Sequence, residues 1–166
     1  MSIRKSCLGV AFLFASAGAA LANGWFTKSE EDVFSGKQTA VMLGSAVSGS
    51  VYITCDAERN VSVSFIFPMK EDIDTSLKGV IVLKVDSGET VRLDGEAYQH
   101  NDKYGGFKAD VQDDQKAALV KSIGAAKKKI LAGLHVESLD SKHSVDISPD
   151  GSTKAASQFL KACEIQ

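Results

Sequence analysis

The side chains of this sequence that are best suited to acid–base or metal chemistry near neutral pH are those of three histidines. They are His100, His135 and His143, and the last two flank Glu137 and Asp140. Metal ligands must converge on one point, and strong metal motifs reveal this through their spacing. The spacing of these residues matches no such motif, so we expect ordinary surface histidines and no metal site.

Nucleophilic chemistry has no recognisable motif either. The serine-rich segment 44–50 lacks the Gly-x-Ser-x-Gly spacing of a nucleophile elbow. The carboxylates of Glu71, Asp72 and Asp74 lie in a polar segment with lysines and indicate a solvated connection. We therefore predict no catalytic residue, no cofactor and no enzymatic activity, with a small periplasmic hydrolase as the competing hypothesis.

The N-terminus has the three parts of a secretory signal peptide. Arg4 and Lys5 precede an apolar stretch over 7–20, and small residues occupy the two positions that a signal peptidase reads in the segment 20–22. The apolar stretch is shorter than the roughly 20 residues that span a bilayer. The sequence predicts that 1–22 is a cleaved signal and that 23–166 forms a single periplasmic or secreted domain without a membrane segment.

Cleavage leaves two cysteines, Cys55 and Cys163, because Cys7 departs with the signal. A pair of cysteines in an exported chain predicts a disulfide bond, since that compartment is oxidising. Two basic residues are also lost, so the net charge falls from −2 to −4. This acidic balance argues against nucleic acid or an anionic membrane as the main partner.

In the first half of the mature chain, apolar and polar residues alternate with a period of two, which is typical of β-strands. We therefore expect a sheet to position the candidate residues named above. Val61, Val63, Phe65 and Phe67 share one strand face. The same analysis predicts strands over the ranges 39–43, 50–55, 61–67, 79–85, 90–93, 96–100, 106–111, 134–139 and 144–148.

Two helices are predicted in the C-terminal half. Residues 113–131 have apolar positions at helical spacing, with Asp113 or Asp114 as the N-cap. A second helix begins after a turn at 149–151, with Asp150 or Ser152 as its cap, and its apolar face includes Cys163. The expected fold is therefore α+β: a mostly antiparallel sheet or small sandwich, two late helices and one disulfide.

Two surface features are candidates for binding a partner. Trp25 and Phe26 lie close to the new N-terminus, where they either anchor a partner or fold into the core. Lys127, Lys128 and Lys129 end the first predicted helix. They either dock an acidic partner or lipid headgroups, or they form a solvated helix end that suits the helix dipole.

The order of several short motifs resembles small periplasmic proteins of Gram-negative bacteria. The resemblance is to the type VI secretion-associated VasI-like proteins and, more loosely, to the invasion-associated locus B family, whose further central cysteines this chain lacks. The motifs are Trp25, the strand ending in Cys55, the segment 82–88, Gly105-Gly106-Phe107, the strand 145–148 and the helix from Gly151 to Cys163. The resemblance implies a non-enzymatic role in the envelope, and it supplies no catalytic residues.

The predicted function is an exported accessory or binding protein of the bacterial envelope, linked to secretion or host interaction. Its partner would be another envelope or secreted protein rather than nucleic acid. An inhibitor or immunity protein that blocks an exported enzyme with a loop is an alternative. The sequence indicates no oligomeric state.

Overall fold

Alternating apolar residues form strands along most of the chain. The computed structural model describes residues 24–166, and the predicted signal segment lies outside the described residues. The strands are β1 (Gly24–Glu31), β2 (Gln38–Ala46), β3 (Gly49–Cys55), β4 (Val61–Pro68), β5 (Lys78–Val85), β6 (Thr90–Asn101), β7 (Tyr104–Val111), β8 (Ile130–Val136) and β9 (Ser141–Ile147). The helices are α1 (Asp113–Gly124) and α2 (Ser152–Ala162), and a 3-10 turn covers Glu137–Leu139.

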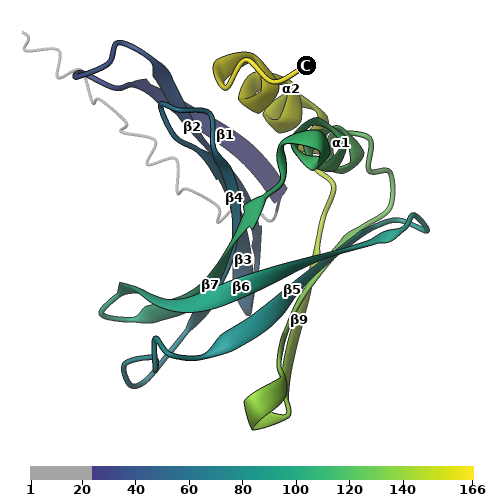
Figure 1. Cartoon of the computed structure of the whole chain (residues 1–166). Coiled ribbons are helices and arrows are strands. Elements are labelled where there is room, and N and C mark those ends of the chain that lie inside the picture. Colours follow the sequence, from purple (N-terminus) through teal and green to yellow (C-terminus); the bar gives the residue numbers. More distant parts are fainter. Residues whose placement is uncertain (1–23) are drawn as a thin grey trace, which may run out of the picture.

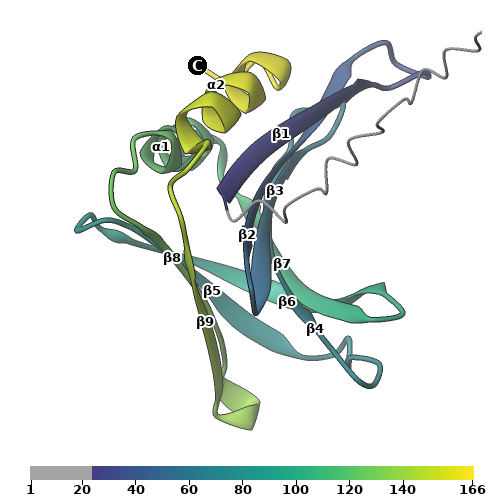
Figure 2. The same ribbon diagram turned by 180° about the vertical axis from the view of Figure 1, so that it is seen from behind.

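The nine strands of the described region form one antiparallel sheet in the order β1-β2-β3-β4-β7-β6-β5-β8-β9. The sheet bends into two arms that face each other, with β1–β4 in one arm and β5, β8 and β9 in the other (Figures 1 and 2). β9 contacts β2 across the bend, and the His143 ring stacks on Phe67 with centroids 5.3 Å apart. Both helices lie together over one end of the space between the arms (Figure 1). The predicted α+β fold class is confirmed.

The core fills the space between the two arms. Phe65 of β4 and Phe107 of β7 are directly paired and fully buried. Phe159 of α2 is also fully buried, so the helix completes the core from the open end. Each of these aromatic side chains buries a large apolar area, and such groups dominate the energetics of a core.

The predicted disulfide between Cys55 and Cys163 is confirmed. It joins the last residue of β3 to the residue after α2, with Cα atoms 6.2 Å apart and both side chains buried. That separation lies in the ordinary range for a disulfide. The bond holds the C-terminal helix on the sheet.

The first predicted helix was too long. α1 ends at Gly124, and Ile130 belongs to β8, where it pairs with Val85 of β5. Strand pairing with β5 overrides the helical spacing of the apolar residues, because local propensity is a weak preference that tertiary contacts override. Neither helix has the predicted side-chain cap: the N-cap residues are Gln112 and Gly151.

The strand predictions needed three corrections. β1 was not predicted at all, because its second half is charged rather than alternating. The ranges 90–93 and 96–100 form one continuous strand, β6, in which Gly95 pairs with Gly79 of β5. β8 ends at Val136, and the last residues of that predicted strand form the 3-10 turn.

The start of β1 closes the fold against the chain that follows β9. The Trp25 amide donates a hydrogen bond to the Asp150 carbonyl at 2.8 Å, and the indole ring is buried over Gly44. A Cβ at residue 44 would lie 2.5 Å from that ring, so the close approach requires glycine. Gly151 has a positive φ of 79° beside the same backbone, which again suits glycine.

Candidate functional site

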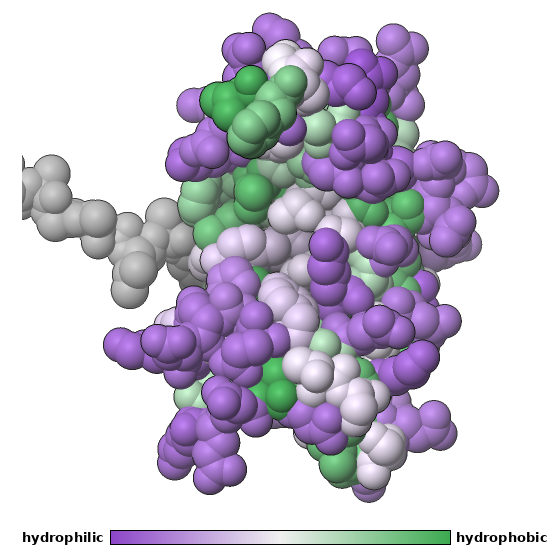
Figure 3. Space-filling model, turned by 60° about the vertical axis from the view of Figure 1, so that its left-hand side comes forward, coloured by the Kyte–Doolittle hydropathy of each residue, from purple (hydrophilic) through white to green (hydrophobic). Residues whose placement is uncertain are grey.

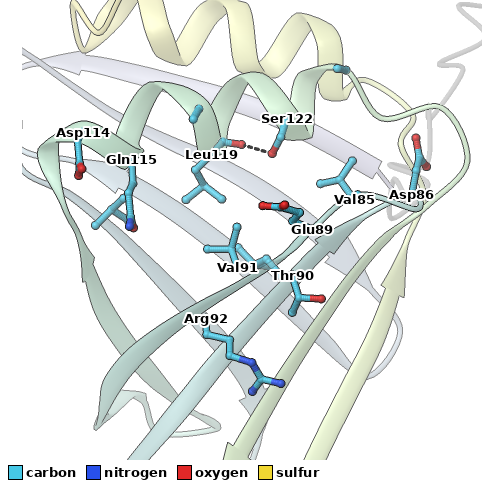
Figure 4. Close-up of a pocket in the computed structure, with 15 residues that line it drawn as sticks. Val85, Asp86, Glu89, Thr90, Val91, Arg92, Asp114, Gln115, Leu119 and Ser122 are labelled. Atoms are coloured by element: carbon cyan, nitrogen blue, oxygen red, sulfur yellow. Dashed lines mark hydrogen bonds between the residues drawn. The ribbon is translucent and has the colours of Figure 1, made fainter.

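A cleft of about 660 Å³ lies between α1 and the hairpin formed by β5 and β6 (Figure 4). Its lining combines polar groups with apolar side chains from three neighbouring strands and from α1. They include Leu83 and Val85 of β5, Val91 of β6, Val111 of β7 and Leu119 of α1. A volume of a few hundred Å³ with apolar walls and a few polar groups is typical of a binding pocket.

Helix α1 forms one wall because its apolar face turns toward the sheet. Leu119, Val120 and Ile123 are buried at helical spacing, while Ala118 lines the cleft and remains exposed. Ser122 donates a hydrogen bond to the Leu119 carbonyl at 2.7 Å within the same helix (Figure 4). The small side chain at position 118 leaves room that a larger residue would fill.

Asp86 lies at one end of the cleft, where its hydrogen bonds hold two segments together. Its carboxylate accepts hydrogen bonds from the backbone amides of Lys127, Lys128 and Lys129, at distances of 2.8 to 2.9 Å. The Asp86 amide in turn donates to the Lys129 carbonyl at 2.9 Å. These amide donors, above all that of Lys129, hold the pKa of the Asp86 carboxyl below its usual value. The turn after β5 is thereby tied to the segment after α1.

The same bonds correct the predicted position of the basic cluster. Lys127, Lys128 and Lys129 do not end a helix; they lie in the loop between α1 and β8. Three consecutive amides point at one carboxylate, and that arrangement pulls the segment out of helical geometry. The three side chains are exposed, and their backbone lies beside Asp86, although none of the three lysines lines the cleft.

Charged side chains lie at both ends of the cleft. Asp114, in the first turn of α1, contributes negative charge at the end opposite Asp86 (Figure 4). Glu89 and Arg92 lie on the hairpin side (Figure 4). Neither of them takes part in a salt bridge with another described residue, so both charges are available to a partner.

The other predicted partner-binding residues, Trp25 and Phe26, do not line this cleft, and they differ from each other in exposure. The Trp25 side chain is buried in the core, whereas Phe26 is 51% exposed on the opposite face of β1. Of the two aromatic side chains, only that of Phe26 is presented to solvent.

The three histidines lie on three different strands. His100 on β6 lies near Tyr52 and Tyr98, with ring centroids 5.5 and 6.0 Å away. His135 is on β8, where it pairs with Val80. Among the described residues, no group of three His, Cys, Asp or Glu side chains could hold a metal ion.

The polar groups that line the cleft can form hydrogen bonds and ion pairs with a ligand. Its lining within the described residues includes carboxylates, hydroxyls and one guanidinium, but neither histidine nor cysteine. Sequence reasoning did not find this site, because its walls come from residues 83–92 and 111–125, which only the sheet order brings together. The one sequence signal was the short gap between the predicted strands 79–85 and 90–93, which by itself indicates a hairpin.

Comparison with known proteins adds no relative: no family model, no curated protein and no solved structure matches this chain. Among residues 24–166, no helix is both long and apolar enough to cross a membrane. The function therefore has to be inferred from the cleft and its surroundings.

Proposed function

We propose that this protein is an exported, non-enzymatic binding protein of the bacterial envelope, periplasmic or secreted, with an accessory role in secretion or host interaction. The cleft between α1 and the β5–β6 hairpin carries the proposal. It recognises an apolar peptide segment of another envelope or secreted protein. No cofactor takes part.

The shape and lining of the cleft support a peptide segment as the ligand. Apolar side chains of the segment would contact Val85, Val91 and Ala118, which are the accessible apolar side chains of the lining. Burial of apolar surface provides most of the free energy of such contacts. The few polar groups at the rim then select the orientation of the ligand.

The charges at the two ends support a particular polarity of the segment. A basic residue of the ligand suits the end at Asp114, and an acidic residue suits the exposed Lys127–Lys129 beside the end at Asp86. Complementary charges at the rim affect the association rate and the specificity more than the affinity.

The signal-like N-terminus and the disulfide support export. A bond that closes a long loop between Cys55 and Cys163 persists in an oxidising compartment and is rare in the cytoplasm.

Site-specific photocrosslinking in the native host tests the proposal. A photoreactive amino acid at position 118 lies in the cleft, whereas one at position 121 lies on the same helix outside it. We expect one crosslinked protein from position 118 and none from position 121. Ala118→Trp should then abolish binding of that purified protein, while the matched Lys121→Trp should leave binding unchanged.

Two results would contradict the proposal. Equal crosslinking from both positions would show that the cleft is not the recognition surface. Turnover of a hydrolase substrate by the purified protein, lost in His135→Ala without loss of fold, would favour the enzyme hypothesis instead.

A further inference from the structure

Strand β1 is an edge of the sheet, and its backbone hydrogen bonds show which residues face outward. The Trp25 amide points away from β2, because it bonds to Asp150. Outward and inward positions alternate along an antiparallel strand. Thr27, Ser29 and Glu31 therefore direct their amides and carbonyls to the edge.

This edge is open among the described residues from Thr27 to Glu31. No hydrogen bond from another described residue reaches their outward backbone groups, and the turn before α2 covers the edge only at Trp25. Helix α2 lies on one face, where the Thr27 hydroxyl donates to the Ala155 carbonyl at 2.8 Å. Figure 2 shows β1 at the margin of its arm of the sheet. An open edge is a template for another strand.

The charges of β1 are complementary to themselves. If two copies of the strand pair antiparallel with Ser29 opposite Ser29, Lys28 of one copy lies opposite Glu30 of the other, twice. These residues form close, non-hydrogen-bonded pairs, in which Cα atoms are about 4.5 Å apart. Thr27 and Glu31 then form hydrogen-bonded pairs with each other across the interface.

Neighbouring registers are worse for identifiable reasons. A register centred on Lys28 places two lysines opposite each other, and a register centred on Glu30 places two glutamates opposite each other. Like charges directly opposite each other destabilise a strand pair. A centre at Thr27 requires the Trp25 amide, which Asp150 already occupies.

The same register accounts for exposed apolar side chains. Val33 and Phe34, in the turn after β1, are 86% and 97% exposed, and Phe26 near the start of the strand is 51% exposed. Figure 3 shows the apolar protrusion that this turn forms at the upper end of the molecule. Antiparallel pairing brings the end of one copy to the start of the other, so the turn of each copy comes beside Phe26 of its mate.

The turn is ordered by its own hydrogen bonds. The Asp32 carboxylate accepts the Phe34 amide at 2.7 Å, and the Gly36 amide donates to the Asp32 carbonyl at 2.7 Å. The Asp32 amide donates to the Lys37 carbonyl at 2.8 Å. Because the turn is already organised, less conformational entropy is lost when its apolar side chains are buried.

We propose that the protein forms a homodimer through antiparallel pairing of two β1 strands centred on Ser29, which makes one continuous sheet across both copies. The occupant of the edge is a second copy of this chain. The opposite sheet edge, β9, lies against β2 across the bend of the sheet. The dimer interface is separate from the cleft, so Ala118→Trp leaves the dimer intact whether or not the cleft binds a ligand.

Sedimentation velocity of the exported protein tests the dimer over about 1 µM to about 1 mM, the range of weak specific association. We expect a reversible monomer–dimer equilibrium. Lys28→Glu and Glu30→Lys should each raise the dimer Kd about tenfold or more, because each places like charges opposite each other twice. The double variant should restore the dimer, since it exchanges the two charges.

Mixing the two single variants gives the sharpest result. One copy then presents two acidic residues opposite two basic residues of the other, so a heterodimer should form from two proteins that are each monomeric alone. Ser29→Pro should also abolish the dimer, because it removes the central outward amide, and proline is tolerated at such an edge position. Circular dichroism of this variant checks that the monomer is folded.

Lys142→Glu on β9 is the matched control and should leave the dimer unchanged. The proposal is wrong if the wild-type protein stays monomeric up to about 1 mM, a limit that corresponds to very weak binding. It is also wrong if the two single variants fail to associate when mixed, or if Lys142→Glu rather than Lys28→Glu disrupts the dimer.

Discussion

The cleft beside α1 and the edge of β1 are two recognition surfaces of opposite kinds. The cleft is concave, and its specificity lies in side chains that come from four separate elements and the turns beside them. The β1 edge offers mainly backbone groups, and two charged side chains on one strand determine its register. One surface depends on the whole fold, whereas the other depends on eight consecutive residues.

This difference implies that mutations should separate the two surfaces. A change that loosens the helices should affect both, because α2 contacts α1 as well as β1 and β2. A change at the β1–β2 pair should affect only the edge, and a change at Asp86 should affect only the cleft. The variants below test that separation.

Breaking the disulfide should have the largest effect and should damage both surfaces. Cys163→Ser frees α2 from the end of β3 and removes a cross-link between residues 108 positions apart. For a loop of that length, the chain-entropy model gives about 4 to 5 kcal/mol, of which real bonds often deliver less. Urea unfolding of the wild type and the variant measures the loss. An unchanged unfolding midpoint, or alkylation of both thiols in the native wild type, would contradict this role.

Gly44→Ala should disturb β1 and leave the cleft intact. The added methyl group would collide with the buried Trp25 ring, and overpacking of this kind costs about 1 to 3 kcal/mol. Thermal unfolding gives the stability, and sedimentation gives the dimer. Ser45→Ala, one residue along the same strand, is the control. If Gly44→Ala lowers the stability but the dimer Kd is unchanged, dimerisation through the β1 edge does not depend on the packing of Trp25 over Gly44.

Asp86→Asn should weaken the hydrogen bonds that join the turn after β5 to the segment after α1, and it should leave β1 unaffected. The folded state lowers the pKa of Asp86, so its stabilising contribution is full above the unfolded pKa of about 3.9 and is lost as pH falls through the folded pKa. The Tm of the variant should therefore lie below that of the wild type at pH 7, and the gap should close in acid. If the Tm difference between Asp86→Asn and the wild type stayed the same from pH 7 to pH 3, the charge of the Asp86 carboxylate would not be the source of the stabilisation.

Phe34→Ser should have the smallest effect on stability, within about 0.5 kcal/mol, because the ring is exposed in the monomer. Its effect should appear in the dimer equilibrium alone. Leu139→Ser, at another exposed apolar position, is a matched control that should not alter dimerisation. A large loss of monomer stability in Phe34→Ser would show that the turn packs against the fold.

The parts of the fold that were predictable are those determined locally. Val61 to Phe67 alternates except at Ile66, and this strand was found with nearly correct ends. The disulfide followed from the count of two cysteines in an exported chain. The first signal lies within one segment, and the second needed only the number of cysteines, because two cysteines allow a single pairing although they lie 108 positions apart.

The parts that were missed depend on partners far along the chain. The end of α1 is determined by Asp86, about 40 residues earlier, and by pairing of Ile130 with β5. β1 is a strand because β2 pairs with it, although half of it is charged. The cleft was invisible for the same reason, since no stretch of sequence contains more than one of its walls.

Two contacts late in the sequence complete the fold: the Asp150 carbonyl accepts the Trp25 amide of β1, and Cys163 is bonded to Cys55 of β3. Their position in the sequence affects when during synthesis and export the protein can finish folding. Under the proposed export from the N-terminus, Asp150 and Cys163 would cross the membrane after the strands that they contact, so neither contact could form until these residues had followed. Contacts between residues so distant in sequence also make folding slow. Under the proposed export, the polypeptide would therefore stay unfolded during translocation and gain its final rigidity only in the compartment in which the thiols are oxidised.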